Sequence, residues 1–207
     1  MNQTERIHET AVLHPTAIVE PGATIGPHAR VWHFSHVRST AELKKGVSIG
    51  RDVYVDADIT IGEFSRVQNG VSIYKGVEIA DWCFVGPHVI FTNDQRPRAG
   101  NRRWDIVPTR LQTGCSLGAG SIVRCGLTIG SFAMIGAGAV VTKSVPAFTL
   151  AVGFPAREKG RVCACGHVLI GEDMIVESYV LDCCRERLHL DLIPIAEKIS
   201  RQYLQES

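Results

Sequence analysis

The sequence lacks a surplus of charge of either sign. Its 22 lysine and arginine residues are balanced by 21 aspartate and glutamate residues, which gives a formal net charge of +1 at pH 7. Proteins that coat nucleic acids or lie on anionic membranes carry a basic excess. We therefore expect neither nucleic acid nor a membrane among the partners of this chain.

Long apolar runs are also missing. No stretch reaches the roughly 20 apolar residues that a helix needs to cross a bilayer. The first ten residues are polar and lack the apolar centre of a signal peptide. These absences favour a cytoplasmic protein. A chain of 207 residues is long enough for one substantial domain with a small appendage.

The periods of ordinary strands and helices, two and 3.6, are absent as well, and the period that is present is six. From Ile7 to Phe91 every sixth residue is apolar, without a polar interruption, and the phase resumes at Leu111. In a chain that is 45% hydrophobic, chance produces such a run with odds on the order of 10⁻⁵. A smaller residue such as Ala41 often stands four positions later, and glycine often follows the apolar residue directly, as at Gly26.

This pattern predicts a triangular coil. Each hexapeptide forms one flat side and a corner, so that three hexapeptides close one turn, and successive turns stack as parallel strands about 4.8 Å apart. The apolar residue points inward, and glycine relieves crowding at the bend. A β-sandwich, the alternative, would show period two and irregular turns. Three cysteines, Cys83, Cys115 and Cys125, occupy positions for small buried residues and are expected to be free thiols.

The repeat is interrupted once. Phe91 and Leu111 lie 20 residues apart, and the stretch between Asn93 and Pro108 is rich in arginine, asparagine and proline. A polar excursion from a regular solenoid is more often functional than neutral, because the repeat could have continued more simply. We predict a functional extruded loop over residues 93–110, with a neutral surface insertion as the alternative.

The repeat ends after Arg157. We therefore predict a β-helix domain over residues 1–157 and a small C-terminal tail over residues 158–207. Apolar residues at four-residue spacing predict a short amphipathic helix from Leu192 to Leu204 that packs on the prism.

The tail carries two clusters of cysteines, Cys163 with Cys165 and Cys183 with Cys184. Four cysteines in two clusters suggest a structural zinc site in a reducing compartment. The spacings are C-x-C and C-C instead of the usual C-x₂-C. Adjacent cysteines do not easily bind one ion together, so His167 or His189 is an alternative ligand.

The six-residue pattern over Ile7–Val145 resembles the hexapeptide-repeat acyltransferases. The resemblance implies a left-handed parallel β-helix, and it implies a homotrimer with active sites between neighbouring prisms. Three stretches are similar to the bacterial nucleotide-amino-sugar N-acetyltransferases: VWHFSHV at 31–37, QNGVSIY at 68–74 and FTNDQRPRA at 91–99. The most similar type acetylates the 3-amino group of a UDP-2-acetamido-3-amino-2,3-dideoxyglucuronate, and related enzymes act on dTDP-3-amino-3,6-dideoxyhexoses. Cell-surface polysaccharide synthesis is their usual setting.

This resemblance implies roles for individual residues. Asn93 is the chief catalytic candidate, because its amide would hold the acceptor amino group; a loop-capping role is the alternative. Gly70 stands where the family has a second asparagine, and stacking of complete turns places His88 one coil beyond it, at the same corner as Asn69. His88 is the second catalytic candidate. The residues implied for substrate binding are Asn69, Tyr74, His33, His36, Asp94 and Arg98.

The stretches GAGAVVTKSVP at 136–146 and VGFPAR at 152–157 resemble the end of enzymes that use coenzyme A. The resemblance implies acetyl-CoA as co-substrate. Small residues would let the pantetheine arm approach the backbone, and two cations would meet the phosphates. The implied residues are Gly118, Gly136, Ala137, Thr142, Lys143 and Arg157.

Acyl transfer to a hydroxyl needs a base, whereas an amine with a pKa near 8 is in part already a free nucleophile at neutral pH. Related O-acetyltransferases carry a histidine, often before proline, in the loop that leaves this region. Here Arg96 and Pro97 stand there, which favours an amine acceptor. An O-acetyltransferase that uses His88 is the runner-up. A γ-type carbonic anhydrase is disfavoured because the eight histidines lack its spacing, and a purely structural scaffold would not need Lys143.

Overall fold

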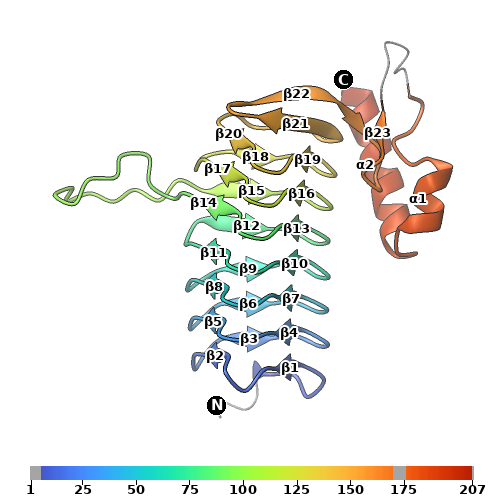
Figure 1. The fold of residues 1–207 in the computed structure, drawn as a ribbon. Helices are drawn as coiled ribbons and strands as arrows, with labels where there is room; N and C mark the ends of the chain where they lie inside the picture. Colours follow the sequence, from blue (N-terminus) through green and yellow to red (C-terminus); the bar gives the residue numbers. More distant parts are fainter. Residues whose placement is uncertain (1–5, 170–175, 207) are drawn as a thin grey trace.

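The computed structural model describes residues 6–169 and 176–206. The chain winds into a stack of three-sided coils of short parallel strands, and the C-terminal helices lie beside its upper end (Figure 1). Strands three apart along the chain are neighbours, so each side of the prism is one sheet. The predicted parallel β-helix, with one extruded loop and a small C-terminal tail, is confirmed.

The seven-stranded sheet contains β2 (Ile18–Val19), β5 (His36–Val37), β8 (Tyr54–Val55), β11 (Ser72–Ile73), β14 (Ile90–Phe91), β17 (Ile122–Val123) and β20 (Val140–Val141). The six-stranded sheet contains β3 (Thr24–Ile25), β6 (Glu42–Leu43), β9 (Thr60–Ile61), β12 (Val77–Ile79), β15 (Thr109–Leu111) and β18 (Thr128–Ile129). The ten-stranded sheet contains β1 (Val12–Leu13), β4 (Arg30–Val31), β7 (Ser48–Ile49), β10 (Arg66–Val67), β13 (Phe84–Val85), β16 (Ser116–Leu117), β19 (Met134–Ile135), β21 (Thr149–Gly153), β22 (Ala156–Val162) and β23 (Val168–Leu169).

Two edges of the prism border the seven-stranded sheet. The first edge is the column of corners where the chain passes from the ten-stranded to the seven-stranded sheet, and it includes residues 32–35, 68–71, 86–89, 118–121 and 136–139. The second edge, where the chain passes on to the six-stranded sheet, includes residues 56–59, 74–76, 92–108, 124–127 and 142–144.

The strands alternate one outward and one inward residue. Arg66 is exposed, for example, whereas Val67 is fully buried, and Arg66 pairs with residues on the coils before and after it, Ser48 and Phe84. The small residues of the repeat, such as Ala41, are buried too. All three cysteines of the coil are buried, as predicted, and the Sγ atoms of Cys83 and Cys115 lie 3.8 Å apart.

The glycines that follow the inward residue are explained by contact between coils. A Cβ atom at Gly62 would lie 2.3 Å from the carbonyl carbon of Ala80 on the next coil. The left-handed residue comes two positions later, at the corner itself, where Phe64 and Trp82 have φ angles of 57° and 60° although they are not glycines. The predicted relief of crowding is therefore confirmed, and its cause is the close approach of the next coil.

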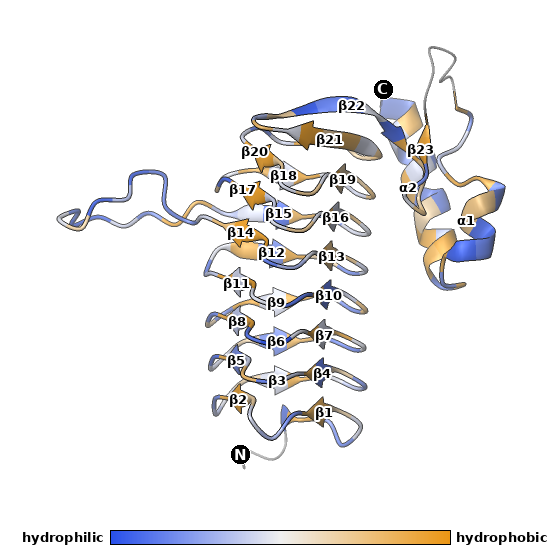
Figure 2. Cartoon of the chain, viewed as in Figure 1, coloured by the Kyte–Doolittle hydropathy of each residue, from blue (hydrophilic) through white to orange (hydrophobic). Residues whose placement is uncertain are grey.

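The extruded segment is an insertion in one side of the prism. Below it, Arg66 pairs with Phe84 one regular turn later, whereas across it the partner of Phe84 is Ser116, much farther along the chain. The segment therefore lengthens a single step of the coil by more than the length of two repeats. It projects far from the prism and is hydrophilic over much of its length (Figures 1 and 2).

The coil ends in a feature that the period did not predict, an antiparallel hairpin of β21 and β22. Two helices follow, α1 (Asp182–Arg187) and α2 (Leu192–Glu206), so the predicted C-terminal helix is confirmed and extends slightly further. They cover a second apolar cluster around Phe148, whose ring stacks on Tyr179 at 4.4 Å. Within the described ranges, no helix is long and apolar enough to span a membrane.

Candidate active site

The predicted site residues divide between the two edges of the seven-stranded sheet. The first edge carries His33, Asn69, His88, Gly118, Gly136 and Ala137, and the second carries Tyr74, Asn93, Asp94, Arg98, Thr142 and Lys143. His36 lies on β5 between them, and Arg157 lies on β22. The two catalytic candidates, His88 and Asn93, stand on either side of β14. The five residue steps between them span at most about 16 Å when extended. The two residues make no hydrogen bond to each other.

At the first edge, His88 lies over Gly70, as the stacking of complete turns predicted. The N–H of His88 donates to the carbonyl of Asn69 at 2.9 Å. A Cβ atom at Gly70 would lie 2.5 Å from Nδ1 of His88, so the exposed imidazole uses the space that a side chain there would take. The Oδ1 atom of Asn69 accepts from the N–H of Arg51 at 3.0 Å, which fixes the orientation of this amide.

A cavity of about 400 Å³ opens lower on the same edge. It is lined by Trp32, His33, Ser48, Gly50, Arg51, Gln68 and Asn69. The ring of His33 stacks on that of His14 at 3.5 Å. Trp32 is 40% exposed. The cavity thus brings two predicted residues, His33 and Asn69, together with flat rings and with a cation, Arg51, that the sequence did not single out.

At the second edge, Asn93 ties down the root of the extruded loop. Its Nδ2 donates to the carbonyl of Lys75 at 3.4 Å, and its own carbonyl accepts from the N–H of Val107 at 3.4 Å, where the loop returns. The Oδ1 atom of Asn93 makes no hydrogen bond to any described residue. The side chain is half-buried, so one end of the amide is anchored and the other is left to accept from a ligand.

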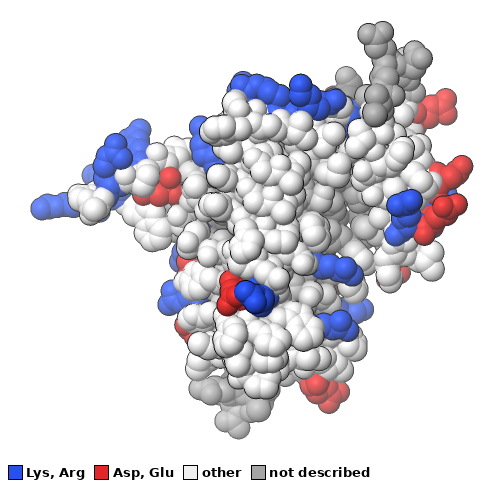
Figure 3. All heavy atoms as spheres, in the orientation of Figure 1, with Lys and Arg blue, Asp and Glu red and all other residues white. Residues whose placement is uncertain are grey.

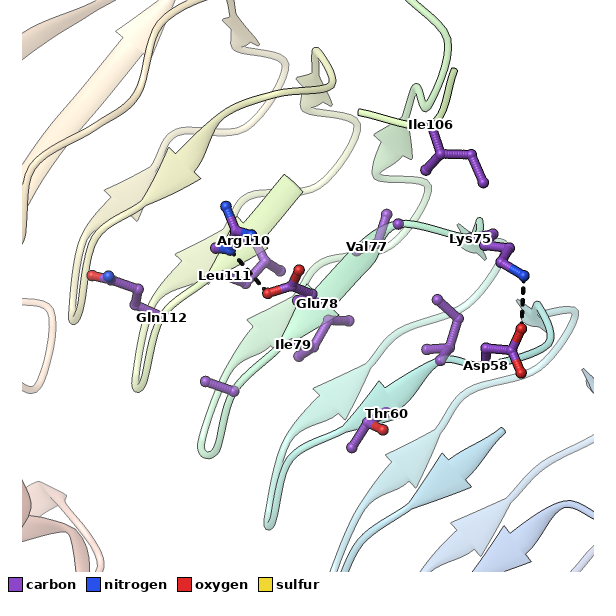
Figure 4. A pocket seen from close by; sticks show the side chains of 13 residues that line it. Asp58, Thr60, Lys75, Val77, Glu78, Ile79, Ile106, Arg110, Leu111 and Gln112 are labelled. Atoms are coloured by element: carbon purple, nitrogen blue, oxygen red, sulfur yellow. Dashed lines mark hydrogen bonds and ion pairs between the residues drawn. The ribbon is translucent and has the colours of Figure 1, made fainter. Parts of the chain in front are cut away.

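Beneath the loop lies a cavity of about 570 Å³ on the six-stranded sheet, lined in part by Ile106 of the loop (Figure 4). Two ion pairs face it. The Nζ atom of Lys75 lies 2.7 Å from Oδ2 of Asp58, and Nε of Arg110 lies 3.0 Å from Oε2 of Glu78. No motif in the sequence indicated this cavity, because Glu78 and Arg110 become neighbours only through the extruded insertion.

Hydrogen bonds shift the pKa values of the charged side chains at the second edge. The hydrogen bond from Lys75, with a second from Thr40, lowers the pKa of Asp58 below its ordinary value, and the same bond raises the pKa of Lys75. On β5 of the seven-stranded sheet, Nε2 of His36 lies 2.7 Å from Oε1 of Glu20. The pKa of Glu20 is lowered, first by the N–H of Ser39 and then by His36.

Aromatic rings line the outer face between the edges. His36 meets Tyr54 edge-on at 5.7 Å, and Tyr54 is tilted against Tyr74 at 6.2 Å. Two predicted substrate residues, His36 and Tyr74, are therefore linked through Tyr54, which the sequence motifs did not include. Tyr54 also donates to Oδ1 of Asp56 at 3.1 Å.

The residues predicted for the coenzyme do not form one cluster. A Cβ atom at Gly118 would lie 2.4 Å from the backbone nitrogen of Ala137, and one at Gly136 would lie 2.7 Å from Val152, so coil stacking alone requires both glycines. Lys143 and Arg157 make no ion pair within the described part of the chain. Figure 3 shows basic side chains gathered where β22 runs and on the extruded loop.

The loop itself is polar and open. Every residue from Gln95 to Asp105 is exposed, and Oδ1 of Asp94 accepts from the N–H of Arg96 at 2.7 Å. The guanidinium of Arg98 donates to the adjacent carbonyl of Pro97. Neither Asp94 nor Arg98 contacts the core, so both can meet a ligand or a second chain.

Residues 108–143 match the family model of the hexapeptide repeat of succinyl-transferase. Over 57 residues the chain is 51% identical to dTDP-3-amino-3,6-dideoxy-alpha-D-galactopyranose 3-N-acetyltransferase of Aneurinibacillus thermoaerophilus, a match that covers 28% of this chain and 30% of the relative. The chain thus carries the hexapeptide repeat of a transferase family over residues 108–143, and it is locally similar to an acetyltransferase. Over 122 residues the chain is 30% identical to serine acetyltransferase of Escherichia coli K12, across 58% of the chain and 38% of the relative.

Among solved structures, that of the polySia-specific acetyltransferase NeuO is similar with a TM-score of 0.52 and 16% identity, over 85% of this chain and 89% of that one. This likeness supports the fold. The matched part of the hexapeptide-repeat chain spans less than half the length of the curated relatives above.

Proposed function

We propose that the protein transfers the acetyl group of acetyl-CoA to the amino group of a nucleotide-linked sugar, a UDP- or dTDP-linked 3-amino sugar used for cell-surface polysaccharide. The observation that carries the proposal is the set of side chains at the second edge. It offers an anchored amide, Asn93, beside charged groups, and its described residues include no histidine. Such an edge suits an amine acceptor better than a hydroxyl. The local similarity to a dTDP-3-amino-sugar N-acetyltransferase supports the same choice.

The reaction needs alignment more than a strong base. The uncharged sugar nitrogen forms a bond to the thioester carbonyl carbon, the carbon–sulfur bond breaks, and the amine proton passes to the departing thiolate or to water. Oδ1 of Asn93 accepts an N–H of the amine and so directs its lone pair at the carbonyl. Correct positioning of two reactants is by itself worth several kcal/mol of barrier.

We assign the remaining predicted residues to binding. The cavity with Trp32, His33 and Asn69 suits a flat nucleotide base, and Arg98 suits the diphosphate or a hexuronate carboxylate. Lys143 and Arg157 carry the coenzyme phosphates, as cations without an ion-pair partner in the described chain.

We further propose that the active site is completed between chains in a homotrimer. His88 and Asn93 stand at opposite edges of one sheet, so one copy does not bring them together. Ile18 and Ile90 point outward from the seven-stranded sheet and are 58% and 51% exposed, and Trp104 on the loop is 58% exposed. Exposed apolar side chains on such a face favour contact between copies. Light scattering should give three times the chain mass, and a monomer at micromolar concentration would exclude this arrangement.

The activity is tested by thiol release from acetyl-CoA with matched pairs of nucleotide sugars that differ only in an amino or a hydroxyl group at C3. We expect turnover with the amino member of a pair and none with the hydroxyl member. Turnover with the hydroxyl members alone would replace this proposal with an O-acetyltransferase, for which the exposed imidazole of His88 would be the base. Metal-dependent hydration of carbon dioxide without thiol release would refute both.

A further inference from the structure

The four cysteines of the tail converge on one point. Their Sγ atoms all lie within 4.8 Å of one another, although they come from positions 163, 165, 183 and 184. The distances are 3.4 Å from Cys163 to Cys165, 3.8 Å from Cys163 to Cys183 and 3.7 Å from Cys165 to Cys183. All four thiols are free.

These distances match the geometry of a tetrahedral thiolate site. With zinc–sulfur bonds of about 2.3 Å, the sulfurs of a regular tetrahedron lie about 3.8 Å apart. Cys163, Cys165 and Cys183 already form one such face. Cys184 is buried on the side of the apolar cluster and stands within reach of the fourth position.

Local backbone structure explains how the unusual spacings work. Cys163 and Cys165 lie in the tight turn between β22 and β23, which is closed by hydrogen bonds from Cys163 N–H to His167 at 3.0 Å and from Gly166 N–H to Cys163 at 2.9 Å. Cys183 and Cys184 lie in the first turn of α1. The turn and the helix face each other, so both members of each pair reach the same point.

The two histidines considered as alternative ligands do not join the cluster. The ring of His189 packs on Trp82 at 5.3 Å, and His167 is not part of the cluster. Three or more metal-binding side chains come together nowhere else in the described ranges.

We propose that these four cysteines bind one structural Zn²⁺ ion, which fastens the C-terminal helices to the β-helix. The ion links the end of β22, which continues the coil, to α1. An ion pair of 2.9 Å between Arg185 and Glu197 then links α1 to α2, and α2 covers the cluster around Phe148. None of the four cysteines belongs to either edge of the seven-stranded sheet, so the proposal does not depend on the acetyltransferase activity. A cytoplasmic location would keep the thiols reduced.

Metal content of the full chain tests the site directly. Protein purified under reducing conditions without chelator should contain about one zinc per chain by mass spectrometry. Cys165→Ala and Cys183→Ala should each reduce this at least tenfold. Cys115→Ala, which removes a buried thiol of the coil, should keep the zinc, and cobalt-loaded wild type should show thiolate-to-metal absorption bands that both tail variants lack.

Wild-type protein supplies a second readout that does not require the variants to fold. Trp82 stacks on Phe64 at 4.4 Å and meets His189 of the tail, so removal of zinc by a chelator should change its fluorescence and lower the thermal midpoint. The fluorescence change should be absent in Trp82→Phe and reversed by added zinc. A zinc-free wild-type protein with an intact midpoint, or a disulfide within the cluster under reducing conditions, would overturn the proposal.

Discussion

The imidazole of His88 fills the space that a side chain at Gly70 would need, with Nδ1 only 2.5 Å from the position of a Cβ atom there. Gly70 has a φ of +69°, in the left-handed region, so its backbone also favours glycine. The resemblance to nucleotide-amino-sugar N-acetyltransferases implies an asparagine at this position, so Gly70 departs from that pattern at the corner where His88 lies.

We predict that Gly70→Asn displaces His88 and destabilises the protein by more than backbone strain alone. Gly120 is the matched control, because it stands in the same column with φ +65° and has nothing within 4 Å of a Cβ atom. Gly120→Asn should cost about 1 kcal/mol of the free energy of unfolding, and Gly70→Asn about 1 kcal/mol more.

A double-mutant cycle with His88→Ala, followed by urea unfolding, separates the two effects. The extra loss at Gly70→Asn should disappear when His88 is alanine. Equal losses for both glycine variants, whether or not His88 is present, would mean that the imidazole does not occupy this space in solution.

Asn93→Ala should reduce kcat/KM for the amino sugar by about tenfold to a hundredfold, because it removes the group that aims the amine, and this corresponds to about 1.4–2.8 kcal/mol of transition-state stabilisation. The oligomer should stay intact. Asn101→Ala is the control in the same loop, since the side chain of Asn101 only accepts from the backbone N–H of Arg103 at 3.1 Å. Unchanged kinetics in Asn93→Ala would leave this asparagine with a purely structural role at the loop root.

Much of the fold was predictable because one rule repeats. Each side of the coil has one inward position for a large aliphatic side chain, and residues such as Ile49 and Ile61 fill it with similar volume, so the period of six is easy to detect. The same stacking placed His88 above Gly70. The four-residue spacing of apolar residues in α2 made this helix predictable as well.

What the period cannot predict is contact across an interruption. Glu78 meets Arg110 because the loop is inserted into a single side of the coil. The phase of the repeat resumes at Leu111, but the period alone does not show which side of the prism the chain rejoins. The cysteine pairs were misleading for a similar reason, since spacing along the chain does not show that a turn and a helix present both members of each pair to one point.

The ion pair of Asp58 and Lys75 should make stability depend on acidic pH. Because the pKa of Asp58 in the folded protein lies below its ordinary value of 3.8, the pair stabilises the fold above that value and loses this effect as the pH falls through the folded pKa. The difference in urea midpoint between wild type and Asp58→Asn should therefore be present at neutral pH and shrink below about pH 4. Lys75→Met should show the same trend, and a difference that stays constant with pH would exclude this pair as its source.

The free cations near the upper coils lead to a prediction about the coenzyme. Lys143→Ala and Arg157→Ala should each raise KM for acetyl-CoA about tenfold with little change in kcat, because phosphate contacts far from the thioester bind ground state and transition state alike. Lys44→Ala, on a lower coil at the opposite side of the prism, should leave KM unchanged. With acetyl-pantetheine, which has no phosphates, the variants and wild type should become equal. A penalty that persists with acetyl-pantetheine would show that these side chains act on the fold or on the acyl group and not on the phosphates.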